Sequence, residues 1–498
     1  MTVERGRPRA LLLSSCAALL LAPSAATGRE APVRPDAFGI NNGVLWPDGL
    51  GELPTARHAD AIGRTGLASV RAIPYWDQIE PQAPNPRTGE HTYDWTRPDA
   101  IARHLARNGL RWDALLGFST PWGGEVPGTT GGAPRIGPFV SYATAVARRY
   151  GRDGAFWRRN PDLPYVPMTQ FQVWNEPNLS GSVLAIRPTH YADLYLAVRR
   201  ALLEVDPHAR VAIGGLVHSA RSGTGNAAGF LQDMFAARPA LAGNVDAVGV
   251  TIYRQNPEQV LEQVRGLREI LDRLGERSTP IDIHETGWAT RGTVLLTDIA
   301  AVSEERRTAM LPELVDLLAA SDCGVQKVTP FAWVTQESLS ADAAGWFGLA
   351  DRRTAELKPS GRAYVDAVRR VTTTPVAPAV RCNRPDLPRL VTPDAARRAP
   401  LAPVASRRCS RGRFVLRFGL GTTSEPYSRL EVTLPGGRPR VTGDPDGGGP
   451  ATLPARLTLP IPRRRGTITV VAKDALGREQ DRATLRLARC PAPRVTRR

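Results

Sequence analysis

Short apolar runs alternate with longer amphipathic stretches along the first three quarters of the chain. The runs are four to seven residues long and rich in β-branched and aromatic side chains, as is typical of buried parallel strands. They occur at Phe38–Asn41, Ser69–Ile73, Trp112–Phe118, Phe171–Trp174, Val211–Gly214, Ala247–Ile252, Ile281–His284 and Val328–Trp333.

The stretches between these runs repeat their apolar residues with the period of a helix. Helices are expected at Arg97–Asn108, Tyr142–Tyr150, Tyr191–Val205, Pro257–Leu274 and Glu304–Ala320, with Thr189 and Ser303 as N-caps of the third and fifth. Eight strand–helix units over roughly 335 residues predict a (β/α)₈ barrel, an α/β fold. A doubly wound open sheet is the alternative, but no glycine-rich phosphate loop follows the first strand.

The composition changes after the predicted barrel domain, which spans residues 34–372. Residues 373–406 are rich in Pro, Ala and Arg and are interpreted as a linker. Short alternating runs separated by Gly- and Pro-rich turns then predict a small C-terminal β-sandwich over residues 407–498. The runs lie at Arg413–Leu420, Ser428–Leu434, Ala455–Ile461, Thr467–Ala472 and Arg482–Leu487.

The N-terminus has the pattern of an export signal over residues 1–26. Three arginines precede the apolar run Leu11–Ala22, and small residues follow it. The sequence Leu13–Cys16 resembles a bacterial lipobox, which leaves a lipoprotein as an alternative, although it lies in the middle of the apolar run. The mature protein is therefore expected to be secreted.

Four cysteines remain after such a cleavage: Cys323, Cys382, Cys409 and Cys490. An even count in an exported chain suggests two disulfides, for which three connectivities exist. Because Cys409 and Cys490 lie near the ends of the β-rich region, we expect them to pair with each other and Cys323 to pair with Cys382. No cysteine or histidine spacing suggests zinc, and we expect neither a metal nor an organic cofactor.

The net charge of +17 is concentrated in the C-terminal region. Residues 373–498 contain 25 basic and 9 acidic residues, a net charge of +16, which leaves +1 for residues 1–372. All but three of the 65 basic residues are arginine, which indicates a compositional bias, so no nucleic-acid partner is expected. The region is either an attachment site for an anionic cell-surface polymer or a solvated basic tail.

Two glutamates follow predicted strands at positions where a barrel carries its functional residues. Glu176 follows the fourth strand in Asn175-Glu176-Pro177, and Glu285 ends the seventh. Since the C-terminal ends of all barrel strands meet at one mouth, both carboxylates should face the same cleft. Pro177 fixes its own φ and helps to hold the turn that carries Glu176.

Two carboxylates at one mouth are what cleavage of a glycosidic bond requires. One is held protonated to donate to the leaving oxygen, and the other attacks the anomeric carbon or activates water. Glu176 is the expected acid because it is flanked by Trp174 and Pro177, and burial beside a second carboxylate raises a pKa. Asn175 is placed to hydrogen-bond a sugar hydroxyl.

The pair "WNEPN" and "HETGW" resembles clan A glycoside hydrolases, in the neighbourhood of families 39 and 5, over roughly residues 36–370. The resemblance implies a retaining mechanism with Glu176 as general acid/base, Glu285 as nucleophile and Asn175 on the hydroxyl beside the anomeric carbon. It also implies that Arg71 and Tyr253 support Glu285. Trp333 would form the floor of the subsite for the cleaved sugar.

This chain departs from the resemblance at two places. Thr251 stands where many relatives carry a histidine, two positions before the strand 6 tyrosine, and the histidine often found after strand 3 is missing. The catalytic pair is unaffected, but the substrate subgroup stays open.

Further residues after the predicted strands are candidates for sugar contacts, because aromatic faces pack against the C–H faces of pyranose rings. Trp122, in the glycine-rich strand 3 loop, is the main candidate platform, and Trp288 is another, although packing in the core is the alternative for each. His218 follows strand 5 and either lines the cleft or is structural.

The sequence therefore predicts a secreted retaining glycosidase that cleaves β-linkages of a polysaccharide or oligosaccharide. A transglycosidase that remodels wall or exopolysaccharide, and an inactive carbohydrate-binding scaffold, are the alternatives.

Overall fold

The structure is a computed structural model. It describes residues 32–41, 55–179, 182, 184–218, 226–292, 300–337 and 343–382. In the C-terminal region it describes 404–410, 413–417, 429–435, 437, 440–443, 456–460, 467–473 and 479–486. The predicted signal peptide lies outside the described residues.

Eight parallel strands form a barrel in chain order, which confirms the predicted (β/α)₈ fold. A parallel bridge between Phe38 and Val328 joins the last strand to the segment before the first. The strands are β1 Ile40–Asn41, β2 Ser69–Ala72, β3 Arg111–Leu116, β4 Gln170–Asn175, β5 Arg210–Val217, β6 Ala247–Thr251, β7 Ile281–Glu285 and β8 Val325–Val328.

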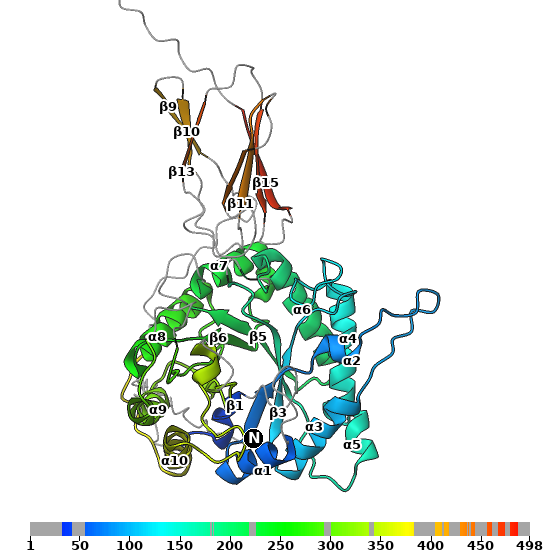
Figure 1. The fold of residues 1–498 in the computed structure, drawn as a ribbon, viewed down its shortest axis with the longest axis vertical. Coiled ribbons are helices and arrows are strands. Elements are labelled where there is room, and N and C mark those ends of the chain that lie inside the picture. Colours follow the sequence, from blue (N-terminus) through cyan, green and yellow to red (C-terminus); the bar gives the residue numbers. More distant parts are fainter. Residues whose placement is uncertain are drawn as a thin grey trace, which may run out of the picture.

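The helices surround these strands as a ring (Figure 1). They are η1 Pro35–Ala37, α1 Thr55–Thr65, α2 Trp76–Ile79, α3 Thr96–Arg107, α4 Ile136–Tyr150, α5 Ala155–Arg159, α6 Pro188–Val205, α7 Ala227–Ala237, η3 Pro239–Leu241, α8 Pro257–Leu274, α9 Glu304–Ala319, η4 Ala343–Trp346 and α10 Pro359–Thr373. All five predicted helices occur. Among the described residues, no helix is both long and apolar enough to cross a membrane.

One of the two predicted helix caps is present. The Ser303 side chain accepts a hydrogen bond from the Arg306 amide at the start of α9, as predicted. The prediction of Thr189 as a cap is wrong, because α6 begins one residue earlier at Pro188 and Arg187 is its N-cap. Proline suits the first helical position, since its fixed φ is helical and its missing N–H would have no partner there.

The predicted position of the eighth strand is also wrong. The strand is Val325–Val328, not Val328–Trp333. It contains the polar Gln326 and Lys327, so it does not read as an apolar run. Lys327 points into the barrel, where its ammonium lies 2.6 Å from Asp113, and this buried ion pair explains a lysine in a central strand.

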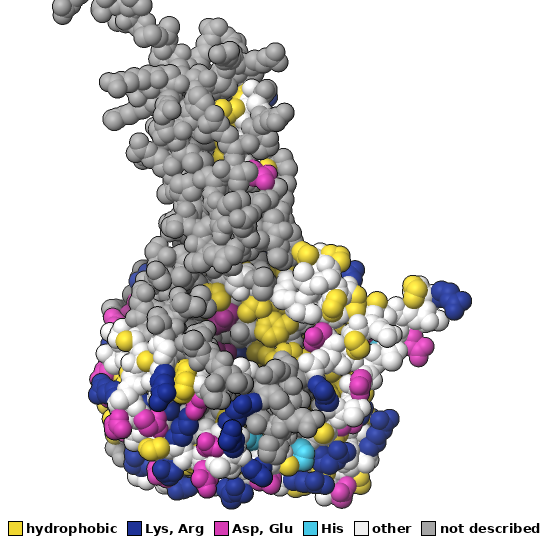
Figure 2. Space-filling model, viewed as in Figure 1, with side chains coloured by type: hydrophobic (Ala, Val, Ile, Leu, Met, Phe, Trp, Pro, Cys, Tyr) yellow, Lys and Arg dark blue, Asp and Glu magenta, His cyan; other side chains and the backbone are white. Residues whose placement is uncertain are grey.

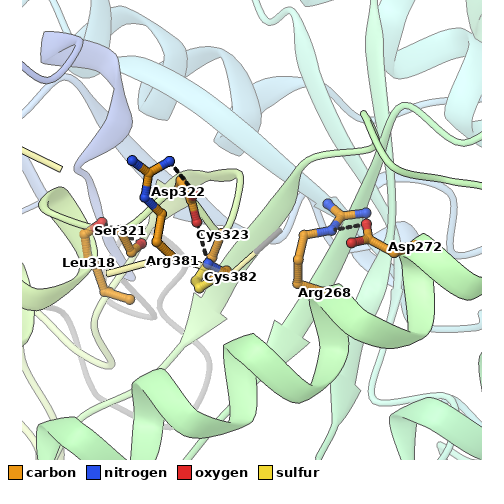
Figure 3. Close-up of a disulfide and its surroundings, with 8 residues drawn as sticks. All are labelled: Arg268, Asp272, Leu318, Ser321, Asp322, Cys323, Arg381 and Cys382. Atoms are coloured by element: carbon orange, nitrogen blue, oxygen red, sulfur yellow. Dashed lines mark hydrogen bonds and ion pairs between the residues drawn. A yellow bond between two sulfur atoms is a disulfide. The ribbon is translucent and has the colours of Figure 1, made fainter. Parts of the chain in front are cut away.

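A disulfide between Cys323 and Cys382 confirms the predicted pairing (Figure 3). It follows α10 and ties the chain back to the turn before β8, where Ser321 and Val380 also form a parallel bridge. The first ten residues of the predicted linker 373–406 thus lie against the barrel. The predicted partner of Cys409, Cys490, lies outside the described residues.

The C-terminal region forms two antiparallel sheets, as the predicted sandwich requires. One has the order β13-β10-β9 and the other β12-β11-β14-β15. The strands are β9 Val404–Ser410, β10 Arg413–Arg417, β11 Arg429–Thr433, β12 Arg440–Gly443, β13 Arg456–Pro460, β14 Thr467–Lys473 and β15 Glu479–Arg486. Val432, Ile468 and Val470 are buried on β11 and β14. The start of β9 falls within the segment predicted as a linker.

Candidate active site

The two predicted catalytic glutamates lie at the C-terminal ends of barrel strands. Glu285 is the last residue of β7, and Glu176 directly follows β4. Because the barrel strands are parallel, both positions open on the same mouth. Their carboxylates are close enough to interact, since the charge of Glu285 contributes to raising the pKa of Glu176.

Arg71 on β2 connects the predicted site residues of three strands. Its Nη1 donates to Oε1 of Glu285 at 3.0 Å, and its Nη2 donates to Oδ1 of Asn175 at 3.0 Å. The Arg71 side chain is only 5 % exposed, and that of Glu285 is 13 % exposed. An ion pair shielded to this degree fixes the orientation of both side chains.

Tyr253, just after β6, holds the other oxygen of the same carboxylate. Its hydroxyl donates to Oε2 of Glu285 at 3.0 Å. Burial and the charges of Glu285 and Glu176 raise the pKa of Tyr253 well above its usual value, so the phenol stays a hydrogen-bond donor. With one donor on each oxygen, Glu285 is held as an oriented anion.

Glu176 has the opposite electrostatic environment. Burial is the main cause, and the charge of Glu285 the second, of a rise in its pKa to about 8, against the opposing effect of Arg71. At neutral pH this carboxyl therefore carries a proton. Two carboxyl groups whose protonation is separated by their surroundings have the roles of an acid and an anion.

The end of β4 is kinked to present these groups. Trp174 has φ 66° and Glu176 has φ 49°, in the left-handed region that side chains rarely adopt. The Gln172 amide donates to the Trp174 carbonyl at 2.7 Å, and the Trp174 indole donates to the Leu184 carbonyl at 2.8 Å. Gly214 on β5 makes room, since a Cβ there would lie 2.6 Å from the Trp174 carbonyl oxygen.

Two residues of this network were not predicted. Asn41 at the end of β1 accepts from Arg71 Nη1 at 2.5 Å and donates to the carbonyls of His284 and Thr329. Gln172 accepts from Arg71 Nε at 2.7 Å. Both carried a signal in the sequence, because Asn41 ends a predicted strand and Gln172 interrupts an apolar run.

The prediction that Trp333 forms the floor of the sugar subsite is wrong. Its side chain is 1 % exposed, and its indole donates to Nδ1 of His58 on α1 at 3.0 Å, so it packs into the helical layer. The aromatic side chains that contact Tyr253 are others. Phe347 lies 5.4 Å from Tyr253 between ring centroids, and Phe331 lies 5.6 Å from Phe347.

Trp288 and Trp122 differ in what they expose. Trp288 is 1 % exposed and donates to the Arg254 carbonyl at 2.7 Å, so its predicted sugar contact is wrong and it belongs to the core. Trp122 is half-buried, donates to the Glu80 carbonyl at 3.0 Å and packs edge-on against Trp76. It keeps an exposed surface and stays a candidate platform.

His218 directly follows β5 and is half-buried. Its carbonyl accepts from Arg254 at 2.5 Å, and burial together with the charge of Arg254 lowers its pKa to about 4. It is therefore neutral at physiological pH. No described group of three or more His, Cys, Asp or Glu side chains is arranged to hold a metal ion.

No protein-family model matches the chain, and no curated protein matches it significantly in sequence. Solved structures do share its fold. The GH39 enzyme from Xanthomonas axonopodis pv. citri matches with a TM-score of 0.51 at 17 % identity, over 78 % of this chain and 72 % of that chain. A glucosidase from Croceicoccus marinus matches with a TM-score of 0.51 at 13 % identity, over 87 % and 94 %. A monomeric beta-xylosidase from Caulobacter crescentus matches with a TM-score of 0.50 at 17 % identity, over 86 % and 95 %. At such identities these likenesses show the fold.

Proposed function

We propose that this protein is a secreted retaining glycoside hydrolase that cleaves O-glycosidic bonds, of β-configuration, in a polysaccharide or oligosaccharide. The observation that carries the proposal is the pair of glutamates at one mouth with opposite environments. Glu285 is held as an anion by Arg71 and Tyr253, while the pKa of Glu176 is raised to about 8. Similar folds in a GH39 enzyme and in a beta-xylosidase are consistent with this chemistry.

In the first step the Glu176 carboxyl gives its proton to the glycosidic oxygen. A Glu285 oxygen attacks the anomeric carbon as the bond from that carbon to the leaving oxygen breaks. The leaving group departs as an alcohol, and the sugar remains on Glu285 as an ester. Asn175, fixed by Arg71, is positioned to hydrogen-bond the hydroxyl beside the anomeric carbon, where charge develops in the transition state.

Formation of the ester changes the electrostatics of Glu176. The negative charge of Glu285 disappears, and with it one of the two causes of the raised pKa of Glu176. The Glu176 carboxylate is then a base with a lower pKa and takes a proton from an incoming water. The resulting hydroxide attacks the anomeric carbon, releases the sugar and restores both glutamates to their starting states.

The complete hydrogen-bond set around Glu285 supports an active enzyme over an inactive binding scaffold, which has no need of an oriented anion. The acceptor in the second step distinguishes a hydrolase from a transglycosidase, and the same residues serve both. Secretion and attachment of the basic C-terminal region to an anionic polymer are further parts of the proposal. They are supported by the sequence of residues 1–26 and by the net charge of residues 373–498.

The test is a panel of β-glucans, xylans, mannans, galactans and bacterial exopolysaccharides, with reducing-sugar release measured for the wild type and for Glu285→Gln. Release by the wild type alone supports hydrolysis and identifies the substrate. The anomer formed first, followed by NMR, tests retention. Polysaccharide binding without release of reducing sugar would favour the inactive binding scaffold. Formation of transfer products with added sugar acceptors, without release of reducing sugar, would favour the transglycosidase.

A further inference from the structure

A hairpin-like arm formed by residues 80–95 leaves the barrel between α2 and α3. It projects well beyond the ring of helices in Figure 1, and Figure 2 shows basic and acidic side chains near its tip. At its base the Asp94 amide donates to the Ile79 carbonyl at 2.7 Å, so the two limbs close on each other. The returning limb, His91 to Trp95, runs beside α4.

A groove of about 530 Å³ lies between this limb and α4. Exposure alternates along the limb: Thr92 and Asp94 are exposed, while His91, Tyr93 and Trp95 are half-buried and turn toward the groove. The rings follow one another at centroid distances of 5.7 Å and 5.3 Å, and those of His91 and Tyr93 are within 9° of parallel. This is a row of aromatic rings whose step is close to the size of one pyranose unit.

The opposite wall of the groove carries polar groups that are unused by the fold. The side chains of Ser141 and the exposed Arg148, both on α4, make no hydrogen bond or ion pair with any residue in the described part of the chain. The neighbouring Arg149 differs, because its guanidinium is bound by Asp99 and lies 5.1 Å over the Trp95 ring. An aromatic row facing unpaired hydroxyl and guanidinium donors suits a chain of sugars better than an apolar peptide.

The aromatic row is fixed before any ligand arrives. The Glu80 carboxylate, fully buried, accepts from the Trp76 indole at 2.8 Å and contacts Nδ1 of His91 at 2.5 Å. The carbonyl of the same residue accepts from the Trp122 indole, which lies at the barrel mouth. Glu80 therefore links His91 in the groove to Trp122 in the loop after β3. A rigid platform binds without the cost of ordering its side chains.

We propose that this groove is a second carbohydrate-binding site, outside the cleft, that holds a segment of the polysaccharide on which the enzyme acts. The proposal rests on the proposed glycosidase function for the identity of its ligand. Tyr93 supplies the central stacking face, and Arg148 with Ser141 hydrogen-bonds the hydroxyls at the rim. The site raises the local concentration of polymer at the mouth and is not used by a substrate of one or two sugars.

The test compares Tyr93→Ala, Arg148→Ala and the double variant with wild type, all as the full chain. Tyr93→Phe keeps the aromatic ring and serves as the conservative variant. Tyr165→Ala is the matched control for Tyr93→Ala, because Tyr165 is 56 % exposed and does not line the groove. Arg107→Ala, at an exposed position of α3, is the matched control for Arg148→Ala. Trp95 is left unchanged because it packs on Tyr150. Retention is measured in native gels that contain xylan, galactomannan or mixed-linkage β-glucan, in a Glu285→Gln background. Hydrolysis of the same polymers and of aryl β-glycosides is measured with Glu285 intact.

We expect the double variant to bind the retained polymer about tenfold more weakly and to lose several-fold in polymer kcat/KM, with aryl glycoside hydrolysis unchanged. Tyr93→Phe and both controls should behave like wild type. The proposed binding site is rejected if the double variant is retained as strongly as wild type, or if no gel retains the wild type. It is also rejected if the double variant loses activity equally on polymer and on aryl glycoside. If the groove substitutions weaken retention but the wild type hydrolyses none of the substrates, the binding site is supported and the glycosidase function is rejected. If the wild type hydrolyses the polymers but the groove substitutions leave retention unchanged, the glycosidase function is supported and the binding site is rejected.

Discussion

The guanidinium of Arg71 joins Glu285 to Asn175, with Nη1 and Nη2 each 3.0 Å from its acceptor. One planar group thereby sets the position of the candidate nucleophile relative to the amide that would bind the sugar. The acceptors come from strands β7 and β4, and Arg71 itself from β2. Its remaining bonds, to Asn41 and Gln172, leave it no freedom to rotate.

Replacing Arg71 by lysine is expected to lower kcat/KM by about 10²–10³. Lysine keeps the charge but cannot donate along fixed directions to Glu285 and Asn175 together. Steady-state kinetics on an aryl glycoside provides the measurement. Arg210→Lys is the matched control, because Arg210 pairs with Asp282 deeper in the barrel. A loss within threefold of the control would contradict the positioning role.

The two glutamates should respond differently to the leaving group. Glu176→Gln removes the proton donor, so hydrolysis of natural substrates is expected to fall by about 10²–10⁴, while activated aryl glycosides that need no proton keep most of the first step. Glu285→Gln removes the attacking oxygen and should abolish both. The rates of each variant on a dinitrophenyl glycoside and on an oligosaccharide check this. Equal losses in the two variants on both substrates would reverse or remove the assigned roles.

The pH dependence follows from the raised pKa of Glu176. Activity on natural substrates is expected to fall as the pH rises through about 8, where the folded protein loses this proton. The pKa of Glu176 is higher in the folded protein than in the unfolded chain. The contribution of this carboxyl to the free energy of unfolding is therefore fully present below about pH 4.5 and is lost as the pH rises through about 8. Glu176→Gln should therefore gain in relative Tm above pH 8. A wild-type pH–rate profile that stays flat to pH 10 would be incompatible with Glu176 as the acid.

The fold and the centre of the site were predictable because both follow from strong local patterns. Apolar runs mark seven of the eight barrel strands, and a strand end places a side chain at the mouth whatever the loops do. Glu176, Glu285, Arg71, Asn175 and Tyr253 all lie at such positions. The position of β8 was predicted wrongly because Lys327 and Gln326 interrupt its apolar pattern. The lysine is explained only by its ion-pair partner Asp113, which lies on β3.

The aromatic residues were harder to assign because tryptophan is equally suited to a core and to a cleft. Trp333 and Trp288 find hydrogen-bond partners, His58 and the Arg254 carbonyl, that lie 275 and 34 residues away. Nothing near either residue in the sequence indicates those partners. Phe331 was not predicted, since its contact with the cluster at Tyr253 depends on how the chain leaves β8.

The corrected assignment of these aromatics leads to a pair of substitutions. Trp333→Phe removes a buried indole and its bond to His58, so we expect a loss of about 2–4 kcal/mol in the free energy of unfolding and an unchanged KM. Phe331→Ala is expected to raise KM for small substrates, because Phe331 belongs to the cluster beside Tyr253. Denaturant unfolding and steady-state kinetics of both variants measure these effects. A change in KM for Trp333→Phe but not for Phe331→Ala would assign the sugar contact to Trp333 after all.

The disulfide determines where the barrel can be separated from the basic C-terminal region. A chain that ends after residue 382 keeps the bond between Cys323 and Cys382, whereas a chain that ends after residue 372 loses it, although it contains nearly all of α10. Because the bond closes a loop of 59 residues, its loss is expected to destabilise the shorter chain by about 4 kcal/mol. The longer chain should match the full protein in aryl glycoside hydrolysis and lose retention on an anionic polymer such as polygalacturonate. Thermal unfolding of the two truncations, with full-length Cys323→Ser/Cys382→Ser as the control, measures the first effect. Equal Tm values would assign no stabilising role to the bond, and undiminished retention of the 1–382 chain would place the polymer contact on the barrel.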